Sequence, residues 1–388
     1  PSLTVPALSA IRNASATPPI GMIIGSAPNE VYWMNKSTIL VSGGVSADYP
    51  ASGANKASGI KQIEYSVNGG SSWSVITTGS GAWTATVNPG TQGVIFRAAD
   101  KAGNTKTESR QIKSDMIPPT LTVKNLKRQG ASGSGTADLS AVQYLNAAAK
   151  LDITYTVEDE ANGSGIRANS VKVAVKSGSV IQYEDLGKPA AAGDNIATID
   201  AAHLTALIDG DYTVELSVMD NAGNSSVARI FNIKIDRKPP TITMLSPAPN
   251  EKHQLSDTTA NWAKSTRLFG KVRVTGAFSD DGSGMNDPLT CTYIIGKDKT
   301  SPKPLLNGDT FKPVSNGSWA LDLANAENYC KTDDYVLPNG RFDENDAPSA
   351  SGIIYKIPLY MTMEDKAGNK AEQAFYIMVD SSGKTPVI

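Results

Sequence analysis

The side chains that could perform catalysis are few in this sequence and lie far apart. Its two histidines, His203 and His253, have neither a cysteine nor a suitable acidic residue close to them in the chain. The 38 acidic residues are scattered, so no carboxylate pair of the glycosidase kind can be located. A Ser-His-Asp group meets only in space, but the β-sandwich cores predicted below lack a deep pocket for one. We therefore predict that the chain is not an enzyme.

Metal binding is the chemistry that the acidic residues favour. No Cys/His cluster with the spacing of a structural zinc site is present. Calcium prefers several carboxylate and carbonyl oxygens, and Asp280, Asp281 and Asp287 bracket one glycine-rich loop. The sequence predicts no cofactor other than calcium at these three aspartates; ordinary turn and capping carboxylates are the alternative. Further acidic residues precede a second such loop or close the repeats described below, namely Asp159, Glu160, Asp115, Asp236 and Asp380.

The two cysteines, Cys291 and Cys330, both lie in the last third of the chain. A disulfide between them would close a long loop and restrict the unfolded chain. Sequence alone leaves a disulfide and two free thiols equally open.

One five-residue signature, Asp-x-Ala-Gly-Asn, occurs three times at domain-sized intervals. Apolar residues alternate with more polar ones before it, and again after the second and third copies, which predicts two strands with one buried face. The glycine can adopt a left-handed conformation and the aspartate can accept backbone N–H groups in the turn. We therefore predict that each copy is a structural hairpin turn. Its key residues are Asp100, Gly103 and Asn104, then Asp220, Gly223 and Asn224, then Asp365, Gly368 and Asn369.

A second signature divides the chain into units. A proline pair or single proline precedes a β-rich run at Pro18-Pro19, Pro118-Pro119, Pro239-Pro240 and Pro386. The last three follow aspartates that close the preceding unit. We therefore predict an N-terminal tail or linker at 1–17, domains at 18–115, 116–236 and 237–380, and the start of another repeat at 381–388. Proline restricts the backbone, so these linkers predict an elongated array.

A third signature, Ser-Gly followed by an apolar residue, occurs in each unit at Ser58-Gly59, Ser164-Gly165 and Ser283-Gly284. Together, the three signatures resemble bacterial immunoglobulin-like repeat domains of surface and adhesin-type proteins, over about residues 18–380. The resemblance implies an all-β chain of three tandem immunoglobulin-like β-sandwiches.

The same resemblance implies a non-catalytic, extracellular stalk or adhesin fragment on the bacterial cell surface. Its partners would be neighbouring immunoglobulin-like domains of the same chain and a host or cell-surface protein or glycan. Two alternatives stay open: an accessory spacer or carbohydrate-binding region of a secreted enzyme, and a phage or fibre component.

Composition excludes other partner classes. The formal net charge is −2, whereas nucleic-acid binding calls for basic patches. The sequence contains no run of 18 apolar residues, so it predicts no membrane-spanning helix. Of the large aromatic residues that could hold glycans, we expect Trp83 and Trp319 to face the core. A long polar insertion near 325–351 distinguishes the third domain. If any part of the chain contacts a specific partner, we expect it to be this insertion; a decoration of the sandwich without a partner is the alternative.

Overall fold

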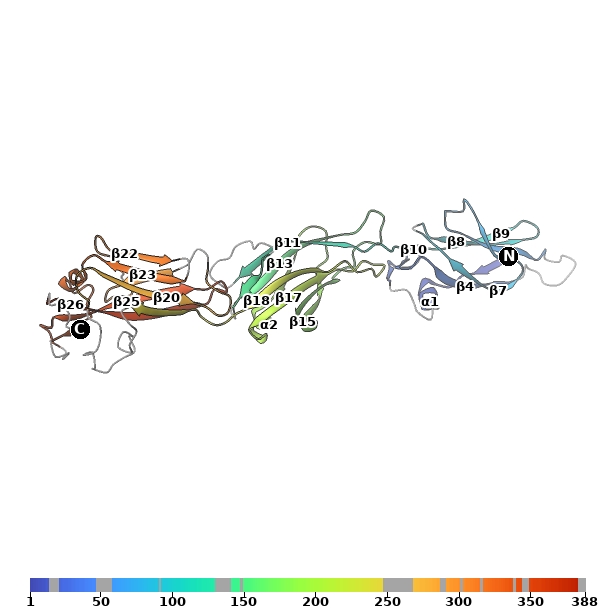
Figure 1. The fold of residues 1–388 in the computed structure, drawn as a ribbon. Helices are drawn as coiled ribbons and strands as arrows, with labels where there is room; N and C mark the ends of the chain where they lie inside the picture. Colours follow the sequence, from blue (N-terminus) through green and yellow to red (C-terminus); the bar gives the residue numbers. More distant parts are fainter. Residues whose placement is uncertain are drawn as a thin grey trace. The chain divides into compact units, whose positions relative to one another are not determined.

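Strands, many of them with alternating buried and exposed residues, form nearly all of the regular secondary structure in the computed structural model (Figure 1). They build three tandem immunoglobulin-like β-sandwiches. The structure describes residues 1–13, 21–46, 58–90, 92–129, 141–146, 149–246, 268–286, 291–300, 303–314, 317–337, 340–343 and 349–382.

Contacts divide the chain into two compact units. One comprises Pro1–Leu126, Asp152–Thr198 and Thr213–Phe231, and the other comprises Lys127–Leu151, Ile199–Tyr212 and Asn232–Ile388. This division runs through the strands of the middle sandwich, so the boundaries at 116 and 236 stay predictions.

The first sandwich has a core of aliphatic and aromatic residues that includes Val41, Trp83 and Phe96. One sheet has the order β1-β4-β7 and another the order β6-β5-β8-β9, while a small third sheet has the order β10-β3-β2. The bounds are β1 Ser2–Thr4, β2 Ile23–Ile24, β3 Val31–Met34, β4 Ile39–Ser46, β5 Ile60–Ser66, β6 Ser74–Thr77, β7 Gly81–Val87, β8 Val94–Asp100, β9 Thr105–Arg110 and β10 Ile112–Ser114, with helix α1 at Leu8–Asn13.

The predicted N-terminal tail at 1–17 is wrong. Strand β1 pairs antiparallel with β4, with Leu3 opposite Val45, and Leu3, Leu8 and Ile11 are buried in the first core. The sequence Pro-Ser-Leu-Thr-Val at 1–5 matches Pro-Thr-Leu-Thr-Val at 119–123, so the first sandwich begins with this strand. Pro18-Pro19 lies outside the described residues.

The middle sandwich has the sheets β11-β13-β16 and β12-β18-β17-β14-β15. Tyr212 directly follows an Asp-Gly-Asp turn, a pattern that predicts the tyrosine corner of immunoglobulin-like sandwiches. Its hydroxyl donates a hydrogen bond to the Ile208 carbonyl at 2.9 Å, as that corner requires. The bounds are β11 Thr120–Gln129, β12 Gln143–Leu145, β13 Lys150–Glu158, β14 Val171–Ser177, β15 Val180–Lys188, β16 Asn195–Ile199, β17 Gly210–Ser217 and β18 Arg229–Ile235, with helix α2 at Ala201–Ala206.

The third sandwich has the sheet β19-β20-β23-β22 and a second sheet in which β25 pairs with β21, β24 and β26. Its core includes Trp319, Leu359 and Phe375. The bounds are β19 Thr241–Ser246, β20 Val272–Ser279, β21 Cys291–Ile295, β22 Thr310–Val314, β23 Ser318–Leu323, β24 Arg341–Phe342, β25 Ile354–Glu364 and β26 Lys370–Asp380, with the 3-10 helix η3 at Ala326–Lys331.

The described part of the 325–351 insertion packs onto the third sandwich. Tyr329 of η3 is fully buried and donates its hydroxyl to Asp309 at 2.7 Å. Phe342 of β24 packs with Ile354, Tyr376 and Met378 in a second apolar cluster. That this insertion contacts a partner stays a prediction.

The disulfide that the sequence left open is not formed, because Cys291 and Cys330 are free. Cys291 pairs with Met363 near one end of β25. Cys330 lies near the other end, where the charges of Asp380 and Arg341 act on its thiol. The two ends of β25 are about 30 Å apart at about 3.4 Å per residue, whereas bridged cysteines need Cα atoms within about 7 Å.

Each sandwich closes in the same way at its C-terminal end. The backbone N–H of the closing aspartate donates to a carbonyl of a short segment that runs parallel to the last strand. Asp115 donates to Met34 at 3.0 Å, Asp236 to Leu145 at 2.9 Å and Asp380 to Leu268 at 3.0 Å. The closing aspartates are therefore fixed parts of the fold, which matters for the clusters below.

Candidate metal centres at two aspartate clusters

The three Asp-x-Ala-Gly-Asn turns have one geometry. In each, the aspartate N–H donates to the asparagine carbonyl across the turn, and the asparagine N–H donates to the aspartate carboxylate at 2.8 Å. The glycines adopt positive φ values of 92° at Gly103, 96° at Gly223 and 88° at Gly368, which glycine tolerates without a steric penalty. Each turn therefore holds a buried carboxylate in a fixed position.

In the first cluster, the closing aspartate Asp115 meets Asp159 and Asp220, with one oxygen of each within 4.8 Å of the others. Asp115 accepts from the Ser164 N–H at 2.7 Å, and Asp159 accepts from the Gly165 N–H at 2.6 Å. Asp220, in the hairpin turn, is completely buried. The residues that hold these three carboxylates come from the end of β10, the Ser-Gly loop and the hairpin turn.

The second cluster repeats this arrangement with Asp236, Asp280 and Asp365, again within 4.8 Å of one another. Asp236 accepts from the Ser283 N–H and Asp280 from the Gly284 N–H, both at 2.6 Å. Within each compact unit, one closing aspartate is thus combined with a loop aspartate and a turn aspartate from later in the chain.

Some carboxylate oxygens in the clusters are buried yet lack a hydrogen-bond partner. They are Oδ1 of Asp159, Oε2 of Glu160 beside it, and Oδ1 of Asp280. None of the six clustered aspartates forms an ion pair with a lysine or arginine of the described residues. Two unit charges about 4.8 Å apart repel by about 3.5 kcal/mol at an effective dielectric constant of about 20, so each cluster calls for a cation or a bound proton.

The protonation equilibria in the first cluster are displaced in opposite directions. Burial raises the pKa of Asp220, with a further rise from the nearby charge of Asp115. Burial also acts to raise the pKa of Asp115, but hydrogen bonds from Ser164 and Ile117 outweigh it and leave this pKa lowered. Burial, together with hydrogen bonding to Asp159 and Asp115, raises the pKa of Glu160 to about 7.

In the second cluster, burial is the main cause that raises the pKa of Asp365. Hydrogen bonds from Asn369 oppose the rise, while the charges of Asp236 and Asp280 add to it. Both turn aspartates therefore hold their protons more tightly than an exposed carboxyl group does.

The residues present fit a calcium ion. Calcium takes six to eight oxygen ligands in flexible geometry, and each cluster supplies three carboxylates, at least one of them with a buried, unpartnered oxygen. The absence of cysteine and histidine from both clusters disfavours zinc and the softer transition metals.

Of the three aspartates that the sequence nominated for calcium, the structure places Asp280 in a cluster and leaves Asp281 exposed outside it. Asp287 lies outside the described residues. Sequence reasoning placed carboxylates at the ends of the units but did not bring Asp236 and Asp365 to Asp280. The in-phase recurrence of the closing aspartate, the Ser-Gly loop and the turn was the signal that could have found this grouping.

The large aromatic residues offer little surface for a glycan. Trp83 and Trp319 are buried, at 4% and 1% exposure, as their alternation predicts, and Tyr32 and Trp33 are buried as well. Trp262 lies outside the described residues. In the described part of the chain, no helix is long and apolar enough to cross a membrane.

Comparison with known proteins gives matches to solved structures alone: no protein-family model and no curated protein matches this chain. One similar structure concerns host cell surface retention of a 1.5-MDa bacterial ice-binding adhesin, at 15% identity over 89% of this chain and 91% of that one, with a TM-score of 0.31. Another is a tetra-tandem repeat in the extending region of a large adhesion protein, at 17% identity over 90% and 73%, with a TM-score of 0.28.

The fibronectin(III)-like modules of Clostridium thermocellum CbhA are also similar, at 16% identity over 56% of this chain and 95% of that one, with a TM-score of 0.28. The three neighbours are thus described as an adhesin, fibronectin(III)-like modules and a tandem repeat of an adhesion protein. Because their TM-scores lie below 0.5, the fold assignment rests on the strand pairing described above.

Proposed function

We propose that this chain is a non-catalytic segment of an extracellular bacterial surface array, in which calcium at the two aspartate clusters fixes each immunoglobulin-like sandwich to the one before it. The observation that carries the proposal is the position of Asp115 and Asp236. Each closes one sandwich, and each shares its cluster with a loop aspartate and a turn aspartate of the following sandwich.

Direct hydrogen bonds support a fixed joint at both places. The side-chain amide of Asn224 donates to the Asp115 carbonyl at 3.0 Å, and that of Asn369 donates to the Asp236 carbonyl at 3.0 Å. The residue that follows each clustered turn aspartate also accepts a hydrogen bond from the preceding sandwich. At the first joint, the Met22 N–H donates to the Asn221 carbonyl at 3.0 Å. These bonds position the closing aspartate before any ion binds.

Arg128 makes the corresponding contact at the second joint. Its guanidinium donates to the carbonyl groups of Tyr144 and Lys366, both at 2.8 Å, and the Lys366 ammonium lies 5.5 Å from the centre of the Tyr144 ring. The proline pairs that follow Asp115 and Asp236 restrict the backbone further.

Calcium chemistry supports an extracellular location. Sites that supply few protein carboxylates bind calcium with dissociation constants of about 0.1–1 mM in extracellular modules, which suits a three-carboxylate cluster. Such joints would hold a spacer in one conformation and present a neighbouring domain to a host or cell-surface protein or glycan.

Small-angle X-ray scattering with and without calcium tests this function. We expect calcium to reduce interdomain flexibility, so that the distribution of interatomic distances sharpens, and magnesium to have a smaller effect. The variants Asp220→Asn and Asp365→Asn should each lose about half of the change, while Asp281→Asn, outside the clusters, should keep it. Scattering curves that calcium leaves unchanged would contradict the proposed role of the joints.

A further inference from the structure

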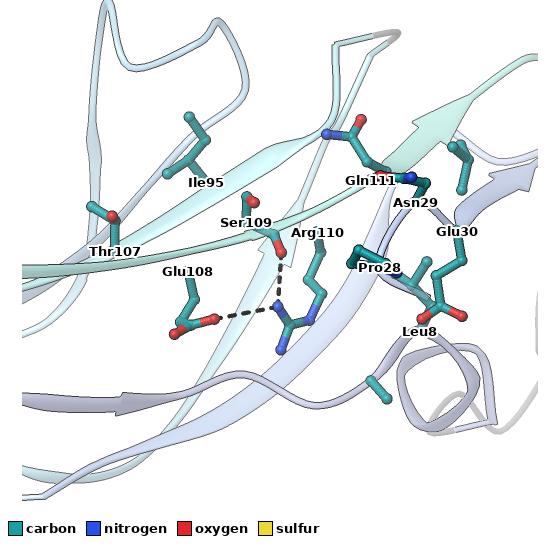
Figure 2. A pocket seen from close by; sticks show the side chains of 12 residues that line it. Leu8, Pro28, Asn29, Glu30, Ile95, Thr107, Glu108, Ser109, Arg110 and Gln111 are labelled. Atoms are coloured by element: carbon teal, nitrogen blue, oxygen red, sulfur yellow. Dashed lines mark hydrogen bonds and ion pairs between the residues drawn. The ribbon is translucent and has the colours of Figure 1, made fainter. Parts of the chain in front are cut away.

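The first sandwich carries a groove beside the outer edge of β9. Its volume is about 950 Å³. Figure 2 shows Thr107, Glu108 and Arg110 of β9 along one side, with Leu8 and Glu30 on the opposite side. The groove therefore lies between a strand edge and the segment that links β1 to β3.

In the part of the chain that the structure describes, strand β9 ends its sheet and pairs with β8 alone. Strand β3, which could have extended the sheet, pairs instead with β10 just beyond β9, beginning where the Tyr32 N–H donates to the Gln111 carbonyl at 2.8 Å. Among the described residues, no strand pairs with the outer edge of Thr105–Arg110. The outer edge of β9 thus lacks a strand partner among these residues, as is usual for the last strand of a sheet.

The pairing of β9 is regular, in contrast to that of another edge strand. Residues 94–99 pair with 105–110 without a register shift. Strand β15 is also at a sheet edge, but its pairing with β14 contains two register shifts, and such bulges protect an edge from further pairing. An added strand could therefore pair with β9 without first straightening it.

The charges in the groove favour a basic ligand. The Arg110 guanidinium is already engaged, since it donates to the Pro6 carbonyl at 2.8 Å, to the Ser109 carbonyl at 2.7 Å and to the Val5 carbonyl. The half-buried Glu30 has no hydrogen-bond or ion-pair partner among the described residues. Glu108 makes only ion pairs of 3.5 Å with Lys106 and Arg110. The Glu30 carboxylate thus has no cation beside it among these residues, whereas a cation of a ligand would have to share or displace the two ion pairs of Glu108.

We infer that this groove binds an extended, basic peptide segment of a partner protein, which adds a strand to the edge of β9. Main-chain hydrogen bonds would supply affinity, as in other cases of strand addition. Lysine or arginine side chains of the peptide would pair with Glu30 and Glu108. The opposing interpretation is that the charged residues Lys106, Glu108 and Arg110 serve to keep strands away from this edge, and the experiment separates the two.

Fluorescence anisotropy with the full chain provides the test. The probe is a fluorescein-labelled peptide of alternating lysine and valine residues, compared with the same peptide carrying glutamate in place of lysine. Two further peptides carry N-methyl groups on every second backbone amide, one in each phase. We expect saturable binding of the lysine peptide, weaker binding of the glutamate peptide, and loss of binding for at least one N-methylated phase.

Substitutions then locate the site. Glu30→Gln and Glu108→Gln should each raise the Kd roughly threefold, as expected for one solvent-accessible ion pair. Glu372→Gln, in β26 of the third sandwich, is the matched control and should leave the Kd unchanged. Absence of saturable binding, undiminished binding of both N-methylated peptides, or insensitivity to the two groove substitutions would overturn the proposal. Circular dichroism checks that the variants are folded.

Discussion

Replacing one clustered carboxylate, in the variant Asp365→Asn, should separate calcium-dependent from calcium-independent stability. Asp365 is completely buried and accepts hydrogen bonds from the backbone N–H and the side-chain amide of Asn369, both at 2.8 Å. The substitution relieves repulsion by Asp236 and Asp280, whose carboxylate oxygens lie within 4.8 Å, of at least about 3.5 kcal/mol per pair at an effective dielectric constant of about 20. It also weakens two charge-assisted hydrogen bonds worth about 1.5–3 kcal/mol each. Without calcium the relief of repulsion is at least as large as the loss of hydrogen bonding, so the variant should not be less stable than the unsubstituted chain.

Calcium should raise the free energy of unfolding of Asp365→Asn by less than it raises that of the unsubstituted chain. A site with a dissociation constant of about 0.1–1 mM stabilises the folded state by about 1.4–2.7 kcal/mol at about 10 mM free calcium. Asp365→Asn should lose at least about 1 kcal/mol of this gain, because calcium then has one fewer anionic ligand. Asp281→Asn, an exposed carboxylate just outside the same cluster, should keep the full gain.

Urea denaturation in calcium and in a chelator measures these differences. Trp319 is buried in the same sandwich as Asp365, so tryptophan fluorescence responds to the unfolding of that sandwich. Where the curve shows more than one transition, each transition is fitted separately. If Asp365→Asn retained the whole calcium-dependent gain, or if Asp281→Asn lost as much of it, the assignment of ligands would be refuted.

Three other predictions concern the fold. Gly43→Ala should destabilise the first sandwich by about 1–3 kcal/mol in thermal unfolding, because a Cβ atom at this position would lie 2.2 Å from the Trp83 ring. Gly44→Ala is the control and should have little effect, because a Cβ atom there would have no other atom within 4 Å. Equal effects of the two substitutions would argue against this packing. Burial raises the pKa of Tyr155 to about 12, so the unfolded state loses this proton at lower pH than the folded state, and the free energy of unfolding should fall by up to about 2.7 kcal/mol between pH 10 and 12. Tyr155→Phe lacks the 2.6 Å hydrogen bond to a backbone carbonyl, so it should be about 1 kcal/mol less stable at neutral pH but should not show this fall. A fall that persists in the variant would contradict the assignment to Tyr155. Burial raises the pKa of Cys330 to about 12 and that of Cys291 to about 11, so labelling with a thiol reagent at pH 8 should be slow until the chain is unfolded, and fast labelling of the folded protein would show that the thiols are accessible.

Local patterns predicted the elements that depend on neighbouring residues. The strands on either side of each Asp-x-Ala-Gly-Asn turn follow from period-two alternation, because one face of each strand is buried. The tyrosine corner at Tyr212 was also predictable, since the tyrosine follows an Asp-Gly-Asp turn directly. Burial of Trp83 and Trp319 followed from the same alternation.

The start of the first sandwich was mispredicted because proline pairs were weighted above strand sequence. Pro18-Pro19 looks like the proline pairs at the later junctions, yet the strand that fits the repeat is Ser2–Thr4. The segment between β1 and β3 is an insertion within the sandwich, and insertions of differing length also follow β11 and β19. A motif of two prolines cannot distinguish an insertion from a junction.

The composition of the aspartate clusters could be predicted only in part. Asp280 was nominated from its glycine-rich loop, which is a local signal. Its partners Asp236 and Asp365 lie far away in sequence and meet it through strand pairing and the closure of the preceding sandwich. Grouping of this kind depends on tertiary structure. In the sequence, the only sign of it is that the three signatures recur in the same order from one repeat to the next.

Counting bound calcium ions by isothermal titration calorimetry tests the central claim most directly. The structure predicts two ions for each chain, one at each aspartate cluster, and one ion for either Asp220→Asn or Asp365→Asn. No measurable calcium binding, or a stoichiometry that neither substitution changes, would contradict the claim that these clusters are calcium sites.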